Sequence, residues 1–134
     1  MQLTVAIPTF NRNAILRANL ERLVPQLDAD CRLLILDNCS PTPVADTILD
    51  ILRESRAPVT LVRHRVNIGG NANVLRTFEL CESDWIWVLG DDDAPHPDAV
   101  ATIKRNITEH PTSRFFNYST ELFARSRTTV TRGP

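Results

Sequence analysis

The feature that most restricts the fold of this chain is a regular alternation between short apolar runs and longer segments of helical period. The apolar runs predict strands at residues 3–9, 32–38, 58–64 and 84–90. The intervening and following segments predict helices at residues 13–27, 44–55, 71–81 and 97–110. Strands separated by helices of about a dozen residues form a parallel sheet through right-handed crossovers. The chain is therefore predicted to have an α/β, Rossmann-like fold, a mostly parallel sheet with helices on both faces.

Two further segments and one helical face complete this prediction. Residues 114–120 and 122–131 are predicted to be additional strands. In the first helix, one apolar face recurs at helical spacing and is predicted to pack on the sheet. Its members are Ile15, Leu16, Leu20, Leu23 and Val24.

Length, charge and cysteine content exclude several classes of protein. At 134 residues and 43% apolar content, residues 1–134 fit a single domain that needs neither disulfides nor a structural metal. A net charge of -1, from 15 basic and 16 acidic side chains, argues against a nucleic-acid partner. Cys31, Cys39 and Cys81 lack the spacing of a disulfide or zinc framework and are predicted to be buried thiols. With no basic leader or long apolar run, we expect a cytoplasmic protein, with peripheral association at the inner face of the membrane left open.

Polar residues follow each of the four predicted strands. The segments are residues 8–12 (PTFNR), 36–40 (LDNCS), 63–73 (RHRVNIGGNAN) and 90–93 (GDDD). Parallel sheets bind ligands beyond the carboxyl ends of their strands, where these segments would meet. The sequence thus predicts a ligand site at this edge of the sheet.

Each segment also has a purely structural explanation. Residues 9–13 suit the start of a helix, where side-chain oxygens accept hydrogen bonds from free amides. Asp37 and Asn38 suit a turn. Gly69 and Gly70 suit a loop with positive φ, although the amides of such a loop also suit a phosphate. The three histidines, His64, His96 and His110, are scattered and are assigned to surface or loop positions.

Three consecutive aspartates, Asp91, Asp92 and Asp93, need a cause of their own. Like charges about 4 Å apart repel by roughly 1 kcal/mol in water and roughly 4 kcal/mol near a protein surface. A divalent cation would offset this repulsion, because Mg²⁺ and Mn²⁺ take carboxylate and phosphate oxygens as ligands. The alternative is a solvated acidic turn ahead of the helix that follows.

These four segments, in this order and strand context, resemble the nucleotide-binding part of family 2 glycosyltransferases of the GT-A fold. The matching motifs are TVAIPTFNR, LILDNCSP, RHRVNIGGNANVLR and WIWVLGDDDAPHPDAV, and the resemblance spans residues 2–104. It implies inverting transfer of a sugar from a nucleotide-diphosphate donor, with a UDP-sugar favoured, to a sugar or lipid-linked hydroxyl acceptor. It also implies Mn²⁺ or Mg²⁺ as cofactor and a role in polysaccharide or glycoconjugate synthesis.

The resemblance assigns a role to individual residues of the donor site. Pro8, Thr9 and Phe10 would line the nucleoside pocket, with Phe10 where the family often has a tyrosine against the base. Asp37 would hydrogen-bond the base. The remaining donor-site positions are Asn11, Arg12, Asn38, Asn67, Gly69 and Asn73.

In the acidic motif, the resemblance implies that Asp91 faces the ribose or donor sugar and that Asp92 and Asp93 bind the metal, Asp92 as the principal ligand. The family often places its first acidic residue where this chain has Gly90. Which two of the three aspartates bind metal therefore stays open.

The general base of the resembled family lies well downstream of the acidic motif. The only carboxylate considered for that role is Glu121, for which a solvent-facing strand position is the alternative. We therefore expect the C-terminal acceptor part to be truncated, and nucleotide binding with little or no transfer by this chain alone. Apolar surface left by a missing part favours a homo-oligomer. Two other functions stay open, a non-catalytic nucleotide-binding module and another Mg²⁺-dependent, phosphate-handling α/β enzyme.

Overall fold

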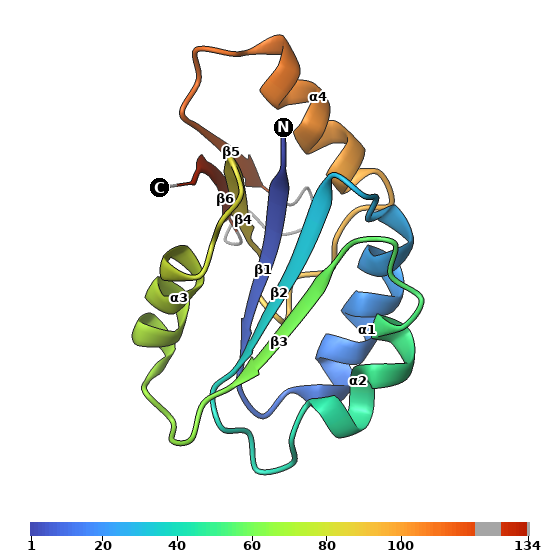
Figure 1. The fold of residues 1–134 in the computed structure, drawn as a ribbon, viewed down its shortest axis with the longest axis vertical. Helices are drawn as coiled ribbons and strands as arrows, with labels where there is room; N and C mark the ends of the chain where they lie inside the picture. The colour runs from blue at the N-terminus through green and yellow to red at the C-terminus, as the bar shows by residue number, and fades with distance from the viewer. Residues whose placement is uncertain (120–126, 134) are drawn as a thin grey trace.

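The computed structural model describes residues 1–119 and 127–133, which form one six-stranded sheet with helices packed against it (Figure 1). The strands are β1 (Leu3–Thr9), β2 (Cys31–Asp37), β3 (Val59–Arg63), β4 (Trp85–Val88), β5 (Phe115–Ser119) and β6 (Arg127–Arg132). The helices are α1 (Asn13–Leu23), α2 (Ala45–Leu52), α3 (Gly70–Glu79) and α4 (Ala99–Glu109), with a 3₁₀ turn, η1 (Val24–Gln26), after α1. The strand order is β3-β2-β1-β4-β6-β5.

The first four strands are parallel and the last two are antiparallel to their neighbours. β1 pairs with β2 on one side and β4 on the other, and β2 pairs with β3. β6 runs antiparallel between β4 and β5. The sheet is therefore mostly parallel, as the alternating sequence pattern predicts.

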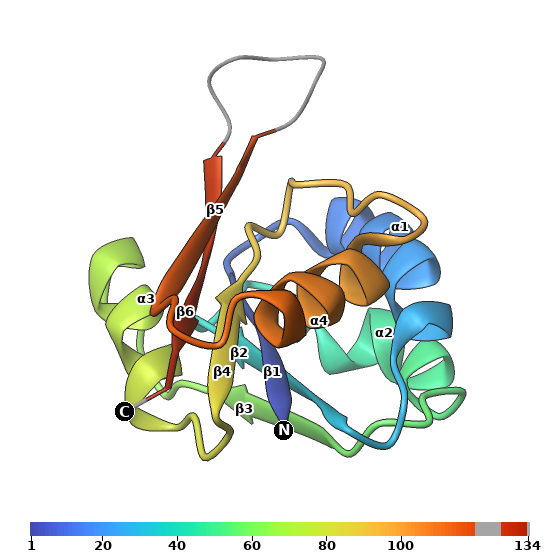
Figure 2. The same cartoon turned by 90° about the horizontal axis from the view of Figure 1, so that it is seen from above.

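Helices cover both faces of the sheet (Figure 2). One hydrophobic cluster joins α1, α2 and α4 to the sheet face that bears Val5 and Ile7. A second, smaller cluster lies on the opposite face, where Ala6 and Leu34 meet Phe78 of α3. Successive residues of β1 point to opposite faces, and both faces are covered by helices. The strand is therefore apolar from Leu3 to Ile7 except for Thr4, which is also buried.

Strand register brings the polar strand ends together. Thr9 lies beside Asp37, and Asp37 lies beside Arg63. The arrowheads of β1, β2 and β3 point to the same edge of the sheet, at the bottom of Figure 1. β4 ends earlier, opposite Ala6, and Leu89 donates a last backbone hydrogen bond to the Ala6 carbonyl. The chain then leaves the sheet just as the acidic residues begin.

The four predicted helices are present, but all four have different limits. α2 spans Ala45–Leu52 rather than residues 44–55, and α3 spans Gly70–Glu79 rather than residues 71–81. α1 ends at Leu23 rather than residue 27, because Pro25 falls in the 3₁₀ turn and has no N–H for a helical bond. α4 begins at Ala99 rather than residue 97. The fifth predicted strand is present as β5 and the sixth as β6; the parts of both predictions that fall on residues 120–126 lie outside the described part of the chain.

Two predicted burial assignments are wrong. Ile15 is 48% exposed, because the buried stripe of α1 consists of Leu16, Asn19, Leu20 and Leu23, and Ile15 lies one position off it. Cys39 is only half-buried, on the loop after β2, where it has a φ of 64°. Cys31 and Cys81 are buried thiols as predicted.

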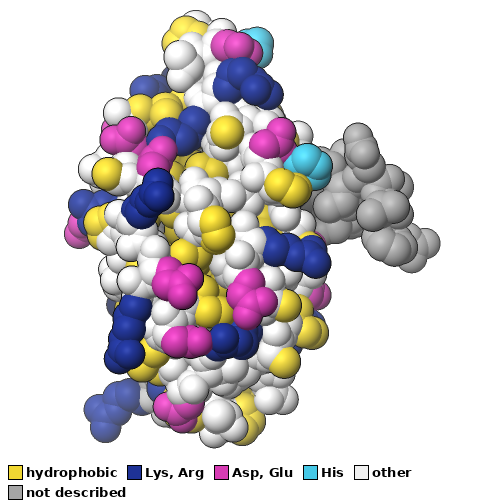
Figure 3. All heavy atoms as spheres, turned by 90° about the vertical axis from the view of Figure 1, so that its right-hand side faces the viewer, with side chains coloured by type: hydrophobic (Ala, Val, Ile, Leu, Met, Phe, Trp, Pro, Cys, Tyr) yellow, Lys and Arg dark blue, Asp and Glu magenta, His cyan; other side chains and the backbone are white. Residues whose placement is uncertain are grey.

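The surface formed by α1, α2 and α4 mixes both signs of charge (Figure 3). Arg17 pairs with Glu21 and Asp50, and Lys104 pairs with Asp28 and Asp30. Within residues 1–119 and 127–133, no helix is both long enough and apolar enough to cross a bilayer. That residues 1–134 form a single domain stays a prediction.

Candidate functional site

The end of β1 and the acidic loop after β4 are joined by hydrogen bonds to Asp91. Thr9 Oγ1 donates to Asp91 Oδ2 at 2.8 Å, and Arg12 Nη1 donates to Asp91 Oδ1 at 2.9 Å. The Asn19 side-chain amide donates to the Asp91 carbonyl at 2.9 Å. Asp91 is only 7% exposed. It is therefore held from three directions and has little freedom to change partners.

Asp92 lies next to the same arginine but faces solvent. Arg12 Nη1 donates to Asp92 Oδ2 at 2.9 Å, and the Asp92 side chain is 55% exposed. The Arg12 guanidinium thus bridges two neighbouring carboxylates and offsets part of their repulsion. The hydrogen bond and the charge interaction with Asp91 contribute most, and those with Asp92 contribute less, to raising the pKa of Arg12. Arg12 therefore stays protonated.

The acidic loop turns tightly over Gly90. The Asp93 amide donates to the Gly90 carbonyl at 3.1 Å. A Cβ at position 90 would lie 2.6 Å from Asp93 Oδ2 and 3.2 Å from Asp92 Oδ1. The carboxylates of Asp92 and Asp93 therefore both approach the space above Gly90, and a side chain there would displace them.

At the neighbouring strand, Asp37 is buried among donors of its own chain. It is 1% exposed and accepts hydrogen bonds from the backbone amides of Ser40, at 2.8 Å, and Val44, at 3.3 Å. Arg63 Nη1 donates to Asp37 Oδ2 at 2.6 Å, and its Nη2 donates to the Ser40 carbonyl at 2.9 Å. Asp37 therefore fixes the loop after β2 and anchors it to the end of β3.

The environment of Asp37 lowers the pKa of its carboxyl group. Burial opposes ionisation most strongly, but the hydrogen bonds from Ser40, Arg63 and Val44 together outweigh it. A group with a lower pKa in the folded chain contributes stability above its unfolded pKa, about 4 for aspartate, and loses it as pH falls through the folded pKa. The pKa of Asp28 is also lowered, chiefly by its hydrogen bond from Lys104.

We therefore expect the free energy of unfolding, measured by urea denaturation, to decrease as pH falls from about 5 to about 3. Part of this decrease belongs to Asp37, so Asp37→Asn should show a shallower dependence over the same range. An identical slope in the variant and the wild-type protein would contradict the assigned direction of the pKa shift.

Two asparagines, Asn38 and Asn67, are joined by a hydrogen bond at the loop between β3 and α3, and a third, Asn73, anchors the start of α3 separately. Asn38 donates to Asn67 Oδ1 at 2.9 Å and accepts from the Ile68 amide at 2.9 Å. Asn67 Oδ1 also accepts from the Gly69 amide at 2.8 Å. Asn73, buried at the start of α3, donates to the Leu36 carbonyl at 3.1 Å. These three predicted donor-site residues are brought together, and they shape the loop.

The other predicted positions lie on the rim of this edge. Phe10 is 42% exposed in the loop after β1. Asn11 has a φ of 53°, a region that asparagine tolerates, and its amide donates to Ser40 Oγ at 2.9 Å. Gly69 has a φ of 92° and precedes α3. His64, assigned to a loop, lies within 2.8 Å of Asn73 Oδ1 through its Nε2.

Three residues that support the site received no individual role from the sequence, although Ser40 and Arg63 lie in two of the predicted strand-end segments; the third is Asn19. A signal for Asn19 was present, since a polar residue stands within the apolar stripe of a predicted helix. Ser40 is fully buried between the loops after β1 and β2. Nothing in the sequence marks Arg63 as the partner of Asp37, because that pairing depends on strand register.

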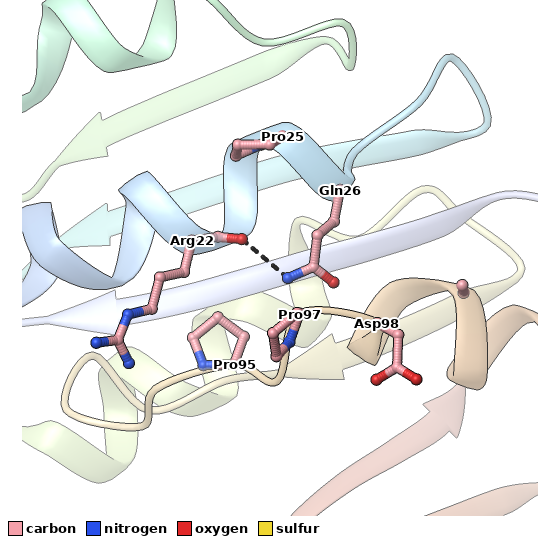
Figure 4. Close-up of a pocket in the computed structure, with 7 residues that line it drawn as sticks. Arg22, Pro25, Gln26, Pro95, Pro97 and Asp98 are labelled. Atoms are coloured by element: carbon pink, nitrogen blue, oxygen red, sulfur yellow. Dashed lines mark hydrogen bonds between the residues drawn. The ribbon is translucent and has the colours of Figure 1, made fainter.

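A pocket of about 590 Å³ lies elsewhere, between the end of α1 and the segment that leads into α4 (Figure 4). Gln26 bridges its two sides, donating to the Arg22 carbonyl at 2.8 Å and the His96 carbonyl at 2.9 Å. The lining residues are Arg22, Pro25, Gln26, Pro95, Pro97, Asp98 and Ala101. None of the predicted site residues is among them.

The acidic loop fits a divalent cation that brings phosphate oxygens with it. Among the described residues, no group of three or more His, Cys, Asp or Glu side chains is arranged to hold a metal alone. Both oxygens of Asp91 accept hydrogen bonds within the chain, whereas the Asp92 side chain is 55% exposed and can turn toward an ion; Asp92 and Asp93 stay the predicted metal ligands. Mg²⁺ and Mn²⁺ sites with one or two carboxylates and substrate phosphates are common.

The strand order and the acidic loop at the carboxyl edge of the sheet define an α/β protein with a candidate ligand site at that edge. The chain belongs to the family described as glycosyl transferase family 2, whose model matches residues 4–129. The family resemblance and the GT-A-type fold are thus confirmed.

Two curated relatives illustrate this membership. Abequosyltransferase RfbV of Salmonella typhimurium is 31% identical over 107 residues, which cover 78% of this chain and 32% of the relative. The succinoglycan biosynthesis protein ExoW of Rhizobium meliloti is 30% identical over 109 residues, covering 80% and 34% of the two chains. The chain therefore spans about one third of the length of these relatives.

Solved structures of low sequence identity share the fold. Staphylococcus aureus TarS 1–349, in complex with UDP-GlcNAc, superimposes with a TM-score of 0.75 at 18% identity, covering 86% of this chain and 33% of TarS. The mannosyltransferase PcManGT of Pyrobaculum calidifontis, in complex with GDP-Man and Mn²⁺, gives a TM-score of 0.73 at 16% identity, covering 85% and 34%.

Proposed function

We propose that this chain is the donor-binding part of an inverting glycosyltransferase that uses a nucleotide-diphosphate sugar and a divalent metal. The observation that supports it most is the juxtaposition of Asp91, Asp92 and Asp93 with Thr9 and Arg12 at the carboxyl edge of the sheet. This edge is where parallel α/β sheets bind nucleotides. The inverting outcome follows from the family resemblance.

In the proposed mechanism, Asp92 and Asp93 hold a Mn²⁺ or Mg²⁺ ion, with Asp92 as the principal ligand. When bound, such an ion neutralises the negative charge that develops on a departing diphosphate. Asp91, held by Thr9 and Asn19, faces the ribose or donor sugar and fixes the loop. Arg12 offers a guanidinium to the phosphate oxygens.

The nucleoside is proposed to lie over the loops after β1, β2 and β3. Phe10 offers an exposed ring to the base, and Pro8 and Asn11 border it. Asp37 is proposed to hydrogen-bond the base; its carboxylate is 1% exposed and already accepts hydrogen bonds from Ser40, Val44 and Arg63, so a uracil N–H would take the place of one of these donors. Asn38, Asn67, Gly69 and Asn73 shape the border of the donor site.

Similar proteins supply the class of donor. TarS is in complex with UDP-GlcNAc, and glucosyl-3-phosphoglycerate synthase of Mycobacterium tuberculosis with Mn²⁺ and UDP-Glc. PcManGT is in complex with GDP-Man and Mn²⁺, so the base differs within this fold. The names of RfbV and ExoW support a role in polysaccharide synthesis. We propose a UDP-sugar as donor and a sugar or lipid-linked hydroxyl as acceptor.

The partners and location complete the proposal. Glu121, the one candidate considered for the general base, lies outside the described residues. A cytoplasmic location, peripheral association with the inner face of the membrane and a homo-oligomeric state stay part of the proposal. Membership of the family argues against the third function considered, another phosphate-handling α/β enzyme.

One observation favours a second candidate, a non-catalytic nucleotide-binding module. Arg12 already neutralises part of the charge on Asp91 and Asp92 without any metal. Such a module would bind the nucleotide equally well with or without Mn²⁺.

Calorimetric titration of UDP into the protein, with and without Mn²⁺, tests the proposed function. We expect binding with Mn²⁺ and at least about tenfold weaker binding in EDTA, because the metal joins the diphosphate to the carboxylates. Uridine, which has no phosphate, should show no dependence on Mn²⁺. GDP and CDP in parallel would identify the base. Absence of UDP binding under both conditions would overturn the proposal, and equal binding under both would favour the non-catalytic module.

A further inference from the structure

Arg12 lies where a cation is needed. Its Nη1 atom is 2.9 Å from Asp91 Oδ1 and 2.9 Å from Asp92 Oδ2, so one nitrogen bridges the two carboxylates. The proposed metal site needs Asp92 as a ligand. Arg12 and a metal ion would therefore compete for the same carboxylate.

We propose that Arg12 is an exchangeable counter-ion, which neutralises Asp92 when no metal is bound and releases it when metal and nucleotide diphosphate bind together. This inference rests on the proposed function, since it concerns the same acidic loop. According to this inference, the metal ion binds weakly in the absence of nucleotide. The nucleotide strengthens metal binding because its diphosphate gives Arg12 another anion to contact.

The charges support such an exchange. Asp91 and Asp92 bring two negative charges, which the single guanidinium of Arg12 offsets only in part. A divalent cation at Asp92 offsets more, but it repels a guanidinium that stays beside it. The diphosphate removes this conflict, because phosphate oxygens are ligands for the metal and acceptors for arginine.

The geometry allows Arg12 to move while Asp91 stays in place. The Arg12 side chain is 47% exposed, so its guanidinium can rotate without opening the hydrophobic core. Asp91 keeps the hydrogen bonds from Thr9 and Asn19 when Arg12 leaves. Asp92 is exposed and has no comparable support from those two residues, so it is the carboxylate that changes partner.

The test is a titration of Mn²⁺ alone, followed by electron paramagnetic resonance of the free ion, in the wild-type protein and in Arg12→Gln. Removal of a positive charge next to the metal ligands should tighten Mn²⁺ binding by about tenfold or more. Arg17→Gln is the matched control, because Arg17 lies in α1, the helix that Arg12 directly precedes, and pairs with Asp50 and Glu21 rather than with the acidic loop. It should change the Mn²⁺ affinity less than about twofold.

A second measurement follows thermal unfolding in EDTA and in Mn²⁺. Arg12→Gln should have a lower midpoint than the wild-type protein in EDTA, because the carboxylates are left without their counter-ion, and Mn²⁺ should restore it. Arg17→Gln should show no restoration by Mn²⁺. In the double variant Arg12→Gln/Asp92→Asn, the gain in Mn²⁺ affinity should disappear.

Two results would overturn the exchange. One is a Mn²⁺ affinity in Arg12→Gln equal to or weaker than that of the wild-type protein. The other is an equal gain in Mn²⁺ affinity in Arg17→Gln, which would show that the gain comes from the change in net charge alone. If Arg12→Gln fails to fold, Arg12→Ser provides the same comparison. Independently of these variants, tight Mn²⁺ binding by the wild-type protein without nucleotide also overturns the exchange. The proposed function fails separately, if UDP does not bind the wild-type protein.

Discussion

Replacing Asp92 with asparagine should abolish the Mn²⁺-dependent part of UDP binding, with a loss of affinity of about 100-fold or more. The carboxylate is the principal proposed ligand, and an amide oxygen lacks the charge that a hard cation requires. The fold should be preserved, because the Asp92 side chain is 55% exposed and its contact in the structure is with Arg12. Calorimetric titration of UDP in Mn²⁺ gives the affinity, and circular dichroism checks the fold.

Asp98→Asn is the matched control for this variant. Asp98 lies in the segment that follows the acidic loop, its side chain is 65% exposed, and it pairs with His96. The substitution removes the same charge without touching the proposed site, so UDP binding should stay within about twofold of wild-type. Unchanged Mn²⁺-dependent binding in Asp92→Asn would refute the assignment of Asp92. Loss in Asp93→Asn alone would then move the principal ligand to Asp93.

Truncation of Asp37 to alanine should lower the free energy of unfolding by about 3 kcal/mol or more. It leaves two buried backbone amides, of Ser40 and Val44, without acceptors, and it leaves Arg63 without its partner. The Arg63 side chain is 38% exposed, so water compensates in part, and we expect the lower end of the range for broken buried pairs. Urea denaturation at pH 7 measures the change.

Asp50→Ala provides the comparison for an ion pair in solvent. Asp50 pairs with Arg17, but its side chain is 64% exposed and the pair is screened by solvent, so the cost should be much smaller than at Asp37. A cost at Asp37 no larger than that at Asp50 would show that the buried network does not stabilise the fold. If the large cost is found, loss of nucleoside binding in Asp37→Ala would reflect a disordered loop, and Asp37→Asn becomes the better probe of a contact with the base.

The alternating apolar pattern was sufficient to predict the order of strands and helices and the edge that bears the site. It succeeded because the strands of a parallel sheet are buried on both faces, so β1 and β2 are almost continuously apolar. It failed at Ile15, which is apolar but lies beside the buried stripe of α1, so its direction around the helix axis leaves it exposed.

The partners within the site could not be predicted, because they depend on contacts between segments far apart in the chain. Arg12 and Asp91 are 79 positions apart, and Arg63 and Asp37 are 26 apart. The repulsion among the aspartates indicated that a cation was needed there. A metal was the cation expected for this role, whereas the structure also provides a cation from the chain itself, Arg12.

The place of β6 in the sheet has a consequence for the order in which the protein can be built. β6 pairs antiparallel with β4, although α4 and β5 come between them in the chain. During synthesis, β4 leaves the ribosome long before β6, and until then one edge of β4 has unpaired backbone groups that can pair with another nascent chain. The acidic loop extends directly from β4, so its support is complete only after this late strand has docked.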